Sequence, residues 1–118
     1  MDNISGEFEL ELCGSVRTLK CNFGVVEHLE RRLFEKPILI VLNDAIQGNI
    51  FFHQVIDTIQ CGLHANKDTR LTREEIGVYV QEKGIMSFLE WYISFLTYAV
   101  TGGNVDESED NTLDPKKK

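Results

Sequence analysis

The side chains best suited to chemistry are three histidines, three cysteines and a pair of adjacent glutamates. Two imidazoles commonly share one metal in HxxxH or HExxH spacing, and His28, His53 and His64 form neither pattern. No two cysteines stand in a CxxC pair, which is the spacing that gives a metal two thiolates. We therefore expect no metal and no other cofactor.

Covalent catalysis needs a cysteine or serine held beside a base, and the chain contains neither a GxSxG turn nor a cysteine-protease signature. Cys61 is typical of a small core residue. Glu74 and Glu75 point about 100° apart on a helix, and Glu75 completes a capping box that Thr72 begins. The glycines form no phosphate-binding loop. We expect that the protein is not an enzyme.

The elements that position these residues are a hairpin and a set of helices. Phe8, Leu10 and Leu12 alternate with glutamates, which is the period of a half-buried strand, and a turn at residues 13–15 leads into a second extended segment. Apolar residues then recur at helical spacing. The sequence predicts an α+β, mainly α, fold in one domain over residues 1–103, with a hairpin at 6–21 and about five helices near 23–34, 37–47, 50–64, 73–83 and 85–101.

Local signals set the expected boundaries. Asn22 and Asn49 are candidate N-caps, and Gly84 is a candidate helix stop. Pro37 suits the first turn of a helix, although the β-branched residues of 38–42 leave a strand as the alternative there. The hairpin would hold Cys13 and Cys21 roughly 20–25 Å apart, so both should be free thiols.

Composition and charge limit the function classes. The chain has 118 residues and a net charge of −7, which argues against nucleic acid as the main partner. No signal segment, an odd cysteine count and no apolar stretch of about 20 residues predict a cytoplasmic protein away from membranes. Residues 104–118 have almost no apolar content and are expected to form a disordered charged tail.

The last predicted helix has more apolar perimeter than one core contact needs. Its apolar arc covers roughly 240°, whereas a helix lying on one core needs about 100°. Trp91, Phe95 and Tyr98 form a shoulder on this helix and are the predicted partner-binding residues. The alternative is that the helix is central and the other elements surround it. A membrane span is disfavoured, because about 16 residues reach only about 24 Å and Glu90 would lie near the middle.

Three segments carry a resemblance to a known family. Residues 6–14 (GEFELELCG), residues 19–24 (LKCNFG) leading into 27–30 (EHLE), and residues 71–77 (LTREEIG) resemble the small tail-assembly proteins of gene transfer agents and related siphophages. These are sometimes labelled tail tube proteins and are better described as tail assembly chaperones. The likeness runs over about residues 6–101. This chain uses Ile, Asn, Phe and Lys where the family is rich in Ala, Gly and Arg, and its aromatic last helix and charged tail lie outside the shared pattern.

The resemblance implies a non-enzymatic chaperone of phage-like particles. It would hold the long helical tape-measure protein soluble until tail tube subunits polymerise around it, so the implied partners are the tape-measure protein and the tail tube protein. The resemblance does not fix whether the protein is a monomer or a homo-oligomer. The alternative is a structural tail tube or connector subunit, which would need large sheets, whereas this sequence offers about two strands.

Overall fold

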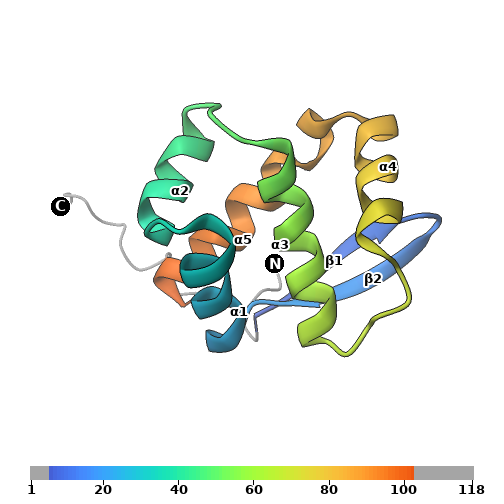
Figure 1. Cartoon of the computed structure of the whole chain (residues 1–118), viewed down its shortest axis with the longest axis horizontal. Coiled ribbons are helices and arrows are strands. Elements are labelled where there is room, and N and C mark those ends of the chain that lie inside the picture. The colour runs from blue at the N-terminus through green and yellow to red at the C-terminus, as the bar shows by residue number, and fades with distance from the viewer. Residues whose placement is uncertain (1–5, 103–118) are drawn as a thin grey trace, which may run out of the picture.

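The computed structural model describes residues 6–102, and every element below lies in that range. An antiparallel hairpin precedes five α-helices, which confirms the predicted α+β, mainly α, fold (Figure 1). The predicted charged tail lies outside the described residues. The elements are β1 (Glu7–Leu12), β2 (Ser15–Lys20), α1 (Phe23–His28), its π-helical continuation η1 (Leu29–Phe34), α2 (Ile38–Ile46), α3 (Phe52–Ala65), α4 (Arg73–Lys83), the 3-10 turn η2 (Ile85–Phe88) and α5 (Leu89–Thr101).

The hairpin turns tightly between β1 and β2. Leu12 pairs with Ser15, so Cys13 and Gly14 alone make the turn, with φ angles of 53° and 90°. Positive φ at both central residues is the geometry that matches the twist of the two strands. Phe8, its partner Leu19, and Leu12 are buried, whereas the glutamates between them are exposed. One face of the hairpin therefore packs on the helices, as the alternation predicted.

The first helix starts as predicted and then changes its winding. The Asn22 side chain accepts a hydrogen bond from the Val25 amide at 2.9 Å, which confirms the N-cap. Beyond His28 the helix widens into η1, whose five-residue spacing places Leu29 and Phe34 in the core. The Glu30 carboxylate then accepts from the Ile38 amide at 2.9 Å, which ties the end of this helix to the start of α2.

The corner between α2 and α3 differs from the prediction at one cap. The N-cap of α3 is Phe51, and Asn49 instead donates its amide to the Asp44 carbonyl at 2.7 Å, in the turn after α2. A phenylalanine side chain cannot accept a hydrogen bond, so the Gln54 side chain serves the Phe51 amide at 3.4 Å. The prediction of Asn49 as the cap is wrong because its amide closes the preceding helix.

The predicted capping box of α4 is present. Thr72 Oγ1 accepts from the Glu75 amide at 3.1 Å, and the Glu75 carboxylate accepts from the Thr72 amide at 2.9 Å. Gly84, with φ of 94°, ends α4. The last predicted helix is divided, because residues 85–88 form η2 before α5 begins at Leu89.

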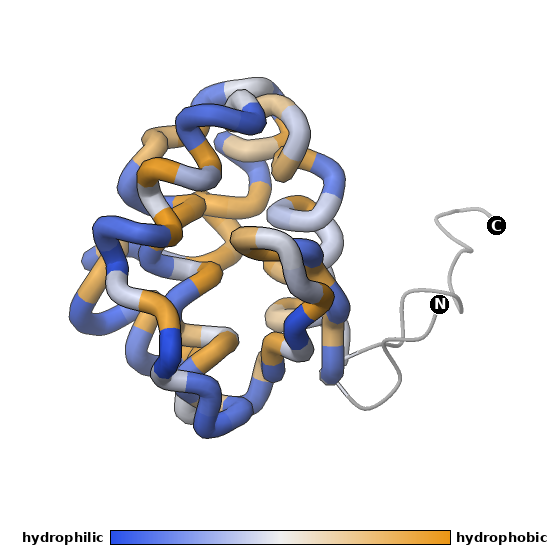
Figure 2. Tube along the Cα trace, turned by 90° about the vertical axis from the view of Figure 1, so that its right-hand side faces the viewer, coloured by the Kyte–Doolittle hydropathy of each residue, from blue (hydrophilic) through white to orange (hydrophobic). Residues whose placement is uncertain are grey.

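The core lies where α3 and α5 meet the hairpin and α2. Tyr92, Phe95 and Leu96 of α5 are fully buried, as are Val55 and Ile59 of α3. Helix α2 packs on α5, and α3 packs on β2. Figure 2 views the end of the molecule that carries α4 and the hairpin turn, and it shows hydrophobic and hydrophilic segments alternating along the tube. This is the pattern expected where each element has one buried and one exposed face.

Candidate functional site

The predicted shoulder on the last helix is largely enclosed. Phe95 is 0% exposed, and Trp91 and Tyr98 are half-buried. The Phe95 ring lies 5.1 Å from the ring of Phe8 on β1 and 5.1 Å from the ring of Trp91. The expectation that Phe95 forms an exposed binding residue is therefore wrong, because the hairpin covers this side of α5.

The other two shoulder residues are also engaged with the body of the protein. Tyr98 packs edge-on against Phe8, with ring centroids 5.9 Å apart. The indole Nε1 of Trp91 is buried and has no hydrogen-bond partner within residues 6–102. A buried indole N–H without a partner is a cost to folding and not a feature of a free surface. The shoulder is better described as part of the packing interface between α5 and the hairpin.

Several exposed apolar side chains lie instead on α2 and at the start of α3. We define the α2 apolar face as Leu39, Ile40 and Ile46, whose exposed fractions are 64%, 48% and 61%; Phe51 and Phe52, at the start of α3, are 59% and 40% exposed. Leu39 and Ile46 are seven residues apart and so lie on one side of the helix. One helix therefore presents several exposed apolar side chains, and not a single isolated one.

The position of α2 explains why this surface is uncovered. Its other side, formed by Ile38, Val41, Leu42 and Ala45, is buried against the core. Figure 1 shows α2 on the side of the molecule away from α4 and from the hairpin turn, so neither can cover its outer face. The signal was present in the sequence, since every residue of α2 except Asn43 and Asp44 is apolar. The sequence prediction considered the apolar arc of the last helix only, so it did not identify the exposed side of α2.

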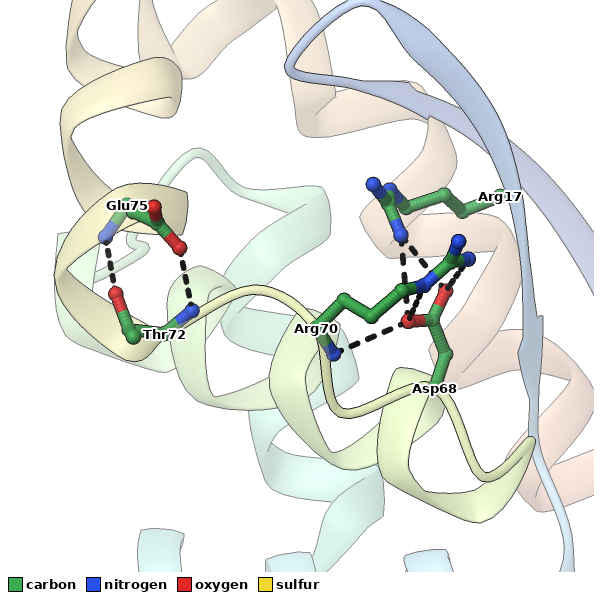
Figure 3. Close-up of polar contacts among 5 residues, drawn as sticks. All are labelled: Arg17, Asp68, Arg70, Thr72 and Glu75. Carbon is green, nitrogen blue, oxygen red and sulfur yellow. Dashed lines mark hydrogen bonds and ion pairs between the residues drawn. The ribbon is translucent and has the colours of Figure 1, made fainter.

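A partly buried polar cluster joins the hairpin to the loop between α3 and α4 (Figure 3). Arg17 Nη1 lies 2.9 Å from Asp68 Oδ2, and Arg70 Nε lies 3.1 Å from Asp68 Oδ1. Hydrogen bonds from Arg70 and Arg17 outweigh the effect of burial and hold the pKa of the Asp68 carboxyl well below its usual range. The carboxylate is therefore committed to two guanidinium groups, which suits a structural role and not proton transfer near neutral pH.

The cysteines divide into one accessible and two shielded thiols. All three are free, as predicted for Cys13 and Cys21. Burial raises the pKa of Cys21 to about 12, and burial together with the neighbouring Asp57 raises that of Cys61 to about 11. Thiols with such raised pKa values are poor nucleophiles at neutral pH. Cys13 is exposed in the hairpin turn.

The histidines are all exposed and come from three separate places on the helices. His28 ends α1, His53 lies in the first turn of α3, and His64 lies in its last turn. His28 and His64 border one open depression together with Cys61. Among residues 6–102, no group of three or more His, Cys, Asp or Glu side chains is arranged to hold a metal ion.

No helix within the described range combines the length and the apolar content that crossing a bilayer requires. Comparisons of the chain with protein-family models, curated proteins and solved structures found no match.

Proposed function

We propose that this chain is a tail assembly chaperone of a phage-like particle, a cytoplasmic protein without enzymatic activity that binds the tape-measure protein and keeps it soluble. The observation that carries the proposal is the α2 apolar face, where Leu39 and Ile46 are each more than 60% exposed. A tape-measure protein is a long helical chain with repeated apolar stripes. An exposed helix with an apolar outer side can pack beside such a stripe and cover it from water.

The charge of the chain supports the same role. A protein with an exposed apolar surface risks associating with its own copies. The net charge of −7 makes those copies repel one another, while a helical partner with an apolar stripe still gains by burying it. The resemblance to small tail-assembly proteins over about residues 6–101 gives the partner its proposed identity.

The second candidate is a tail tube or connector subunit, which would remain in the particle. Tube walls are built from large sheets that continue from one subunit to the next. Within residues 6–102 the sheet consists of two strands only, and most of the described chain is helical. This favours the chaperone over the tube subunit.

The test is co-expression of the chain with affinity-tagged fragments of the tape-measure protein from the same phage-like gene cluster. In the Leu39→Ser/Ile46→Ser double variant, we expect the co-purified amount to fall about tenfold or more, because two exposed apolar contacts are lost. The variant should fold, since both side chains lie mainly in solvent.

The matched control is Val16→Ser/Met86→Ser, which removes two equally exposed apolar side chains outside the α2 apolar face. It should bind as the native chain does. Equal loss in both variants would show that binding is not located on α2. A native chain that binds no tape-measure fragment, and that is present in finished particles, would support the tube or connector subunit instead.

A further inference from the structure

A second surface lies at the other end of the molecule from the α2 apolar face. An open groove of about 640 Å³ lies between the hairpin turn and the outer side of α4. It is bordered by Cys13 on the hairpin and by Glu74, Val78, Tyr79 and Glu82 on α4. Figure 1 shows the hairpin turn and α4 together at the end of the molecule away from α2. The groove is therefore separate from the surface assigned to the tape-measure protein.

The side chains of α4 give this groove an apolar centre between two acidic ends. Glu74, Val78 and Glu82 follow one another at intervals of four residues, which places them along one side of the helix. Val78 is 47% exposed, and the Tyr79 ring lies beside it in the groove. Burial, together with the charge of Glu11 and a hydrogen bond to it, raises the pKa of the Tyr79 hydroxyl, so this hydroxyl is directed at Glu11 of the hairpin and the ring is what Tyr79 offers to the groove.

The basic residues of α4 do not neutralise these acidic ends. Arg73 turns away to Asp57 of α3, with Nε 2.8 Å from Oδ1. Lys83 lies over the Tyr79 ring, with Nζ 5.7 Å from its centroid. Glu75 is occupied by the capping box. Over residues 6–102, neither Glu74 nor Glu82 has an ion-pair partner, so both carboxylates are available to a ligand.

We propose that this groove binds a basic amphipathic segment of another protein, in which one apolar side chain is flanked by Lys or Arg four residues before and four residues after it. The apolar side chain would contact Val78 and Tyr79, and the two basic groups would reach the carboxylates of Glu74 and Glu82. The proposal goes beyond the chaperone function, because it assigns a second binding site for a partner of opposite charge.

Charge argues against a second copy of this chain as the occupant. Each copy carries a net charge of −7, so an acidic groove meets an acidic body when two copies approach. A basic partner is instead attracted before contact, and its binding should weaken as salt is added.

The test uses the full-length chain and two synthetic helical peptides. One peptide has a central Leu with Lys at the positions four residues away on each side, and the matched peptide has Glu in place of both Lys. We expect only the Lys peptide to bind, with amide NMR shifts centred on Cys13, Val78 and Tyr79. In the Glu74→Gln/Glu82→Gln variant, binding should weaken about 3–10-fold at low salt.

The charge-matched control is Glu9→Gln/Glu90→Gln, which removes two exposed carboxylates outside the groove. This control should keep nearly the native affinity. The Leu39→Ser/Ile46→Ser variant should also bind the Lys peptide as the native chain does, which separates this site from the proposed chaperone surface.

Four results would overturn the proposal: no binding of the Lys peptide at millimolar concentration, equal binding of both peptides, equal weakening in the two glutamine variants, or shifts centred on α2. Sedimentation of the native chain tests whether a second copy of the chain occupies the groove. A dimer that Val78→Ser abolishes would assign the groove to a second copy and also overturn the proposal.

Discussion

Arg17 of β2 and Asp68 of the loop after α3 form an ion pair with an N···O distance of 2.9 Å, although 51 residues separate them in the chain. Their side chains are only 10% and 9% exposed. Since Arg17 belongs to the hairpin and Asp68 precedes α4, the pair holds the hairpin against the part of the chain that leads into α4 (Figure 3).

Replacement of Asp68 should destabilise the fold. In Asp68→Asn, the buried guanidinium of Arg17 loses its counter-charge, and we expect the free energy of unfolding to fall by about 3 kcal/mol. Urea denaturation measures it. The control is Arg70→Ala, whose side chain is 75% exposed and should contribute no more than about 1 kcal/mol. Equal losses in the two variants would contradict a special role for the buried pair.

The same carboxyl group should make stability depend on acid pH. Its pKa is lowered in the folded protein, so near and below the unfolded pKa of about 3.9 the unfolded chain binds the proton more readily. Stability from this group is complete above about pH 5 and is lost as pH falls below about 4. The difference in urea midpoint between the native chain and Asp68→Asn should therefore narrow steadily as the pH is lowered from about 5 to about 2. A constant difference over this range would disprove the linkage.

Local sequence signals predicted the hairpin, the Asn22 cap, the Thr72 capping box and the Gly84 stop, because each depends on residues close together in the chain. The π-helical winding of η1 was not predicted. It places Phe34 in the core, and that burial depends on long-range packing and not on helix propensity.

The candidate site likewise combines a feature that the sequence predicts locally with one that depends on long-range packing. Counting the apolar perimeter of the last helix correctly indicates a surplus over one contact, but it cannot show which neighbour covers the surplus. Phe8 of the hairpin covers Phe95, and no described element covers the outer side of α2 at Leu39 and Ile46. The location of the exposed surface is a tertiary property, so only the assembled fold shows it.

Gly62 should be intolerant of alanine although it lies inside a helix. A Cβ at this position would lie 2.9 Å from Cβ of Leu19, where α3 packs on β2. Gly62→Ala should therefore lower the free energy of unfolding by about 1–3 kcal/mol, despite the better helix propensity of alanine. Gly77→Ala is the control, because its nearest neighbour is Cδ1 of Ile56 at 3.4 Å. Thermal denaturation should show a loss for the first variant and little change or a gain for the second.

The three thiols should differ in reactivity. At pH 8, Cys13 should react with a maleimide at least about tenfold faster than Cys21 or Cys61, because burial raises the pKa of both shielded thiols above 10 and limits reagent access. Peptide mapping by mass spectrometry over a time course measures the three rates. In urea the rates should become similar. Fast modification of Cys21 in the native protein would contradict its buried position.

Truncation of a buried and of an exposed apolar side chain should change the free energy of unfolding by very different amounts. Phe95→Ala removes a fully buried ring that packs on Phe8 and Trp91, and it should lower the free energy of unfolding by about 3–5 kcal/mol. Leu39→Ala removes a side chain that is 64% exposed, so its effect on unfolding should stay within about 0.5 kcal/mol. Urea denaturation of both variants measures the difference. A Phe95→Ala protein as stable as the native chain would restore that residue to the surface and return the partner-binding role to the shoulder of α5.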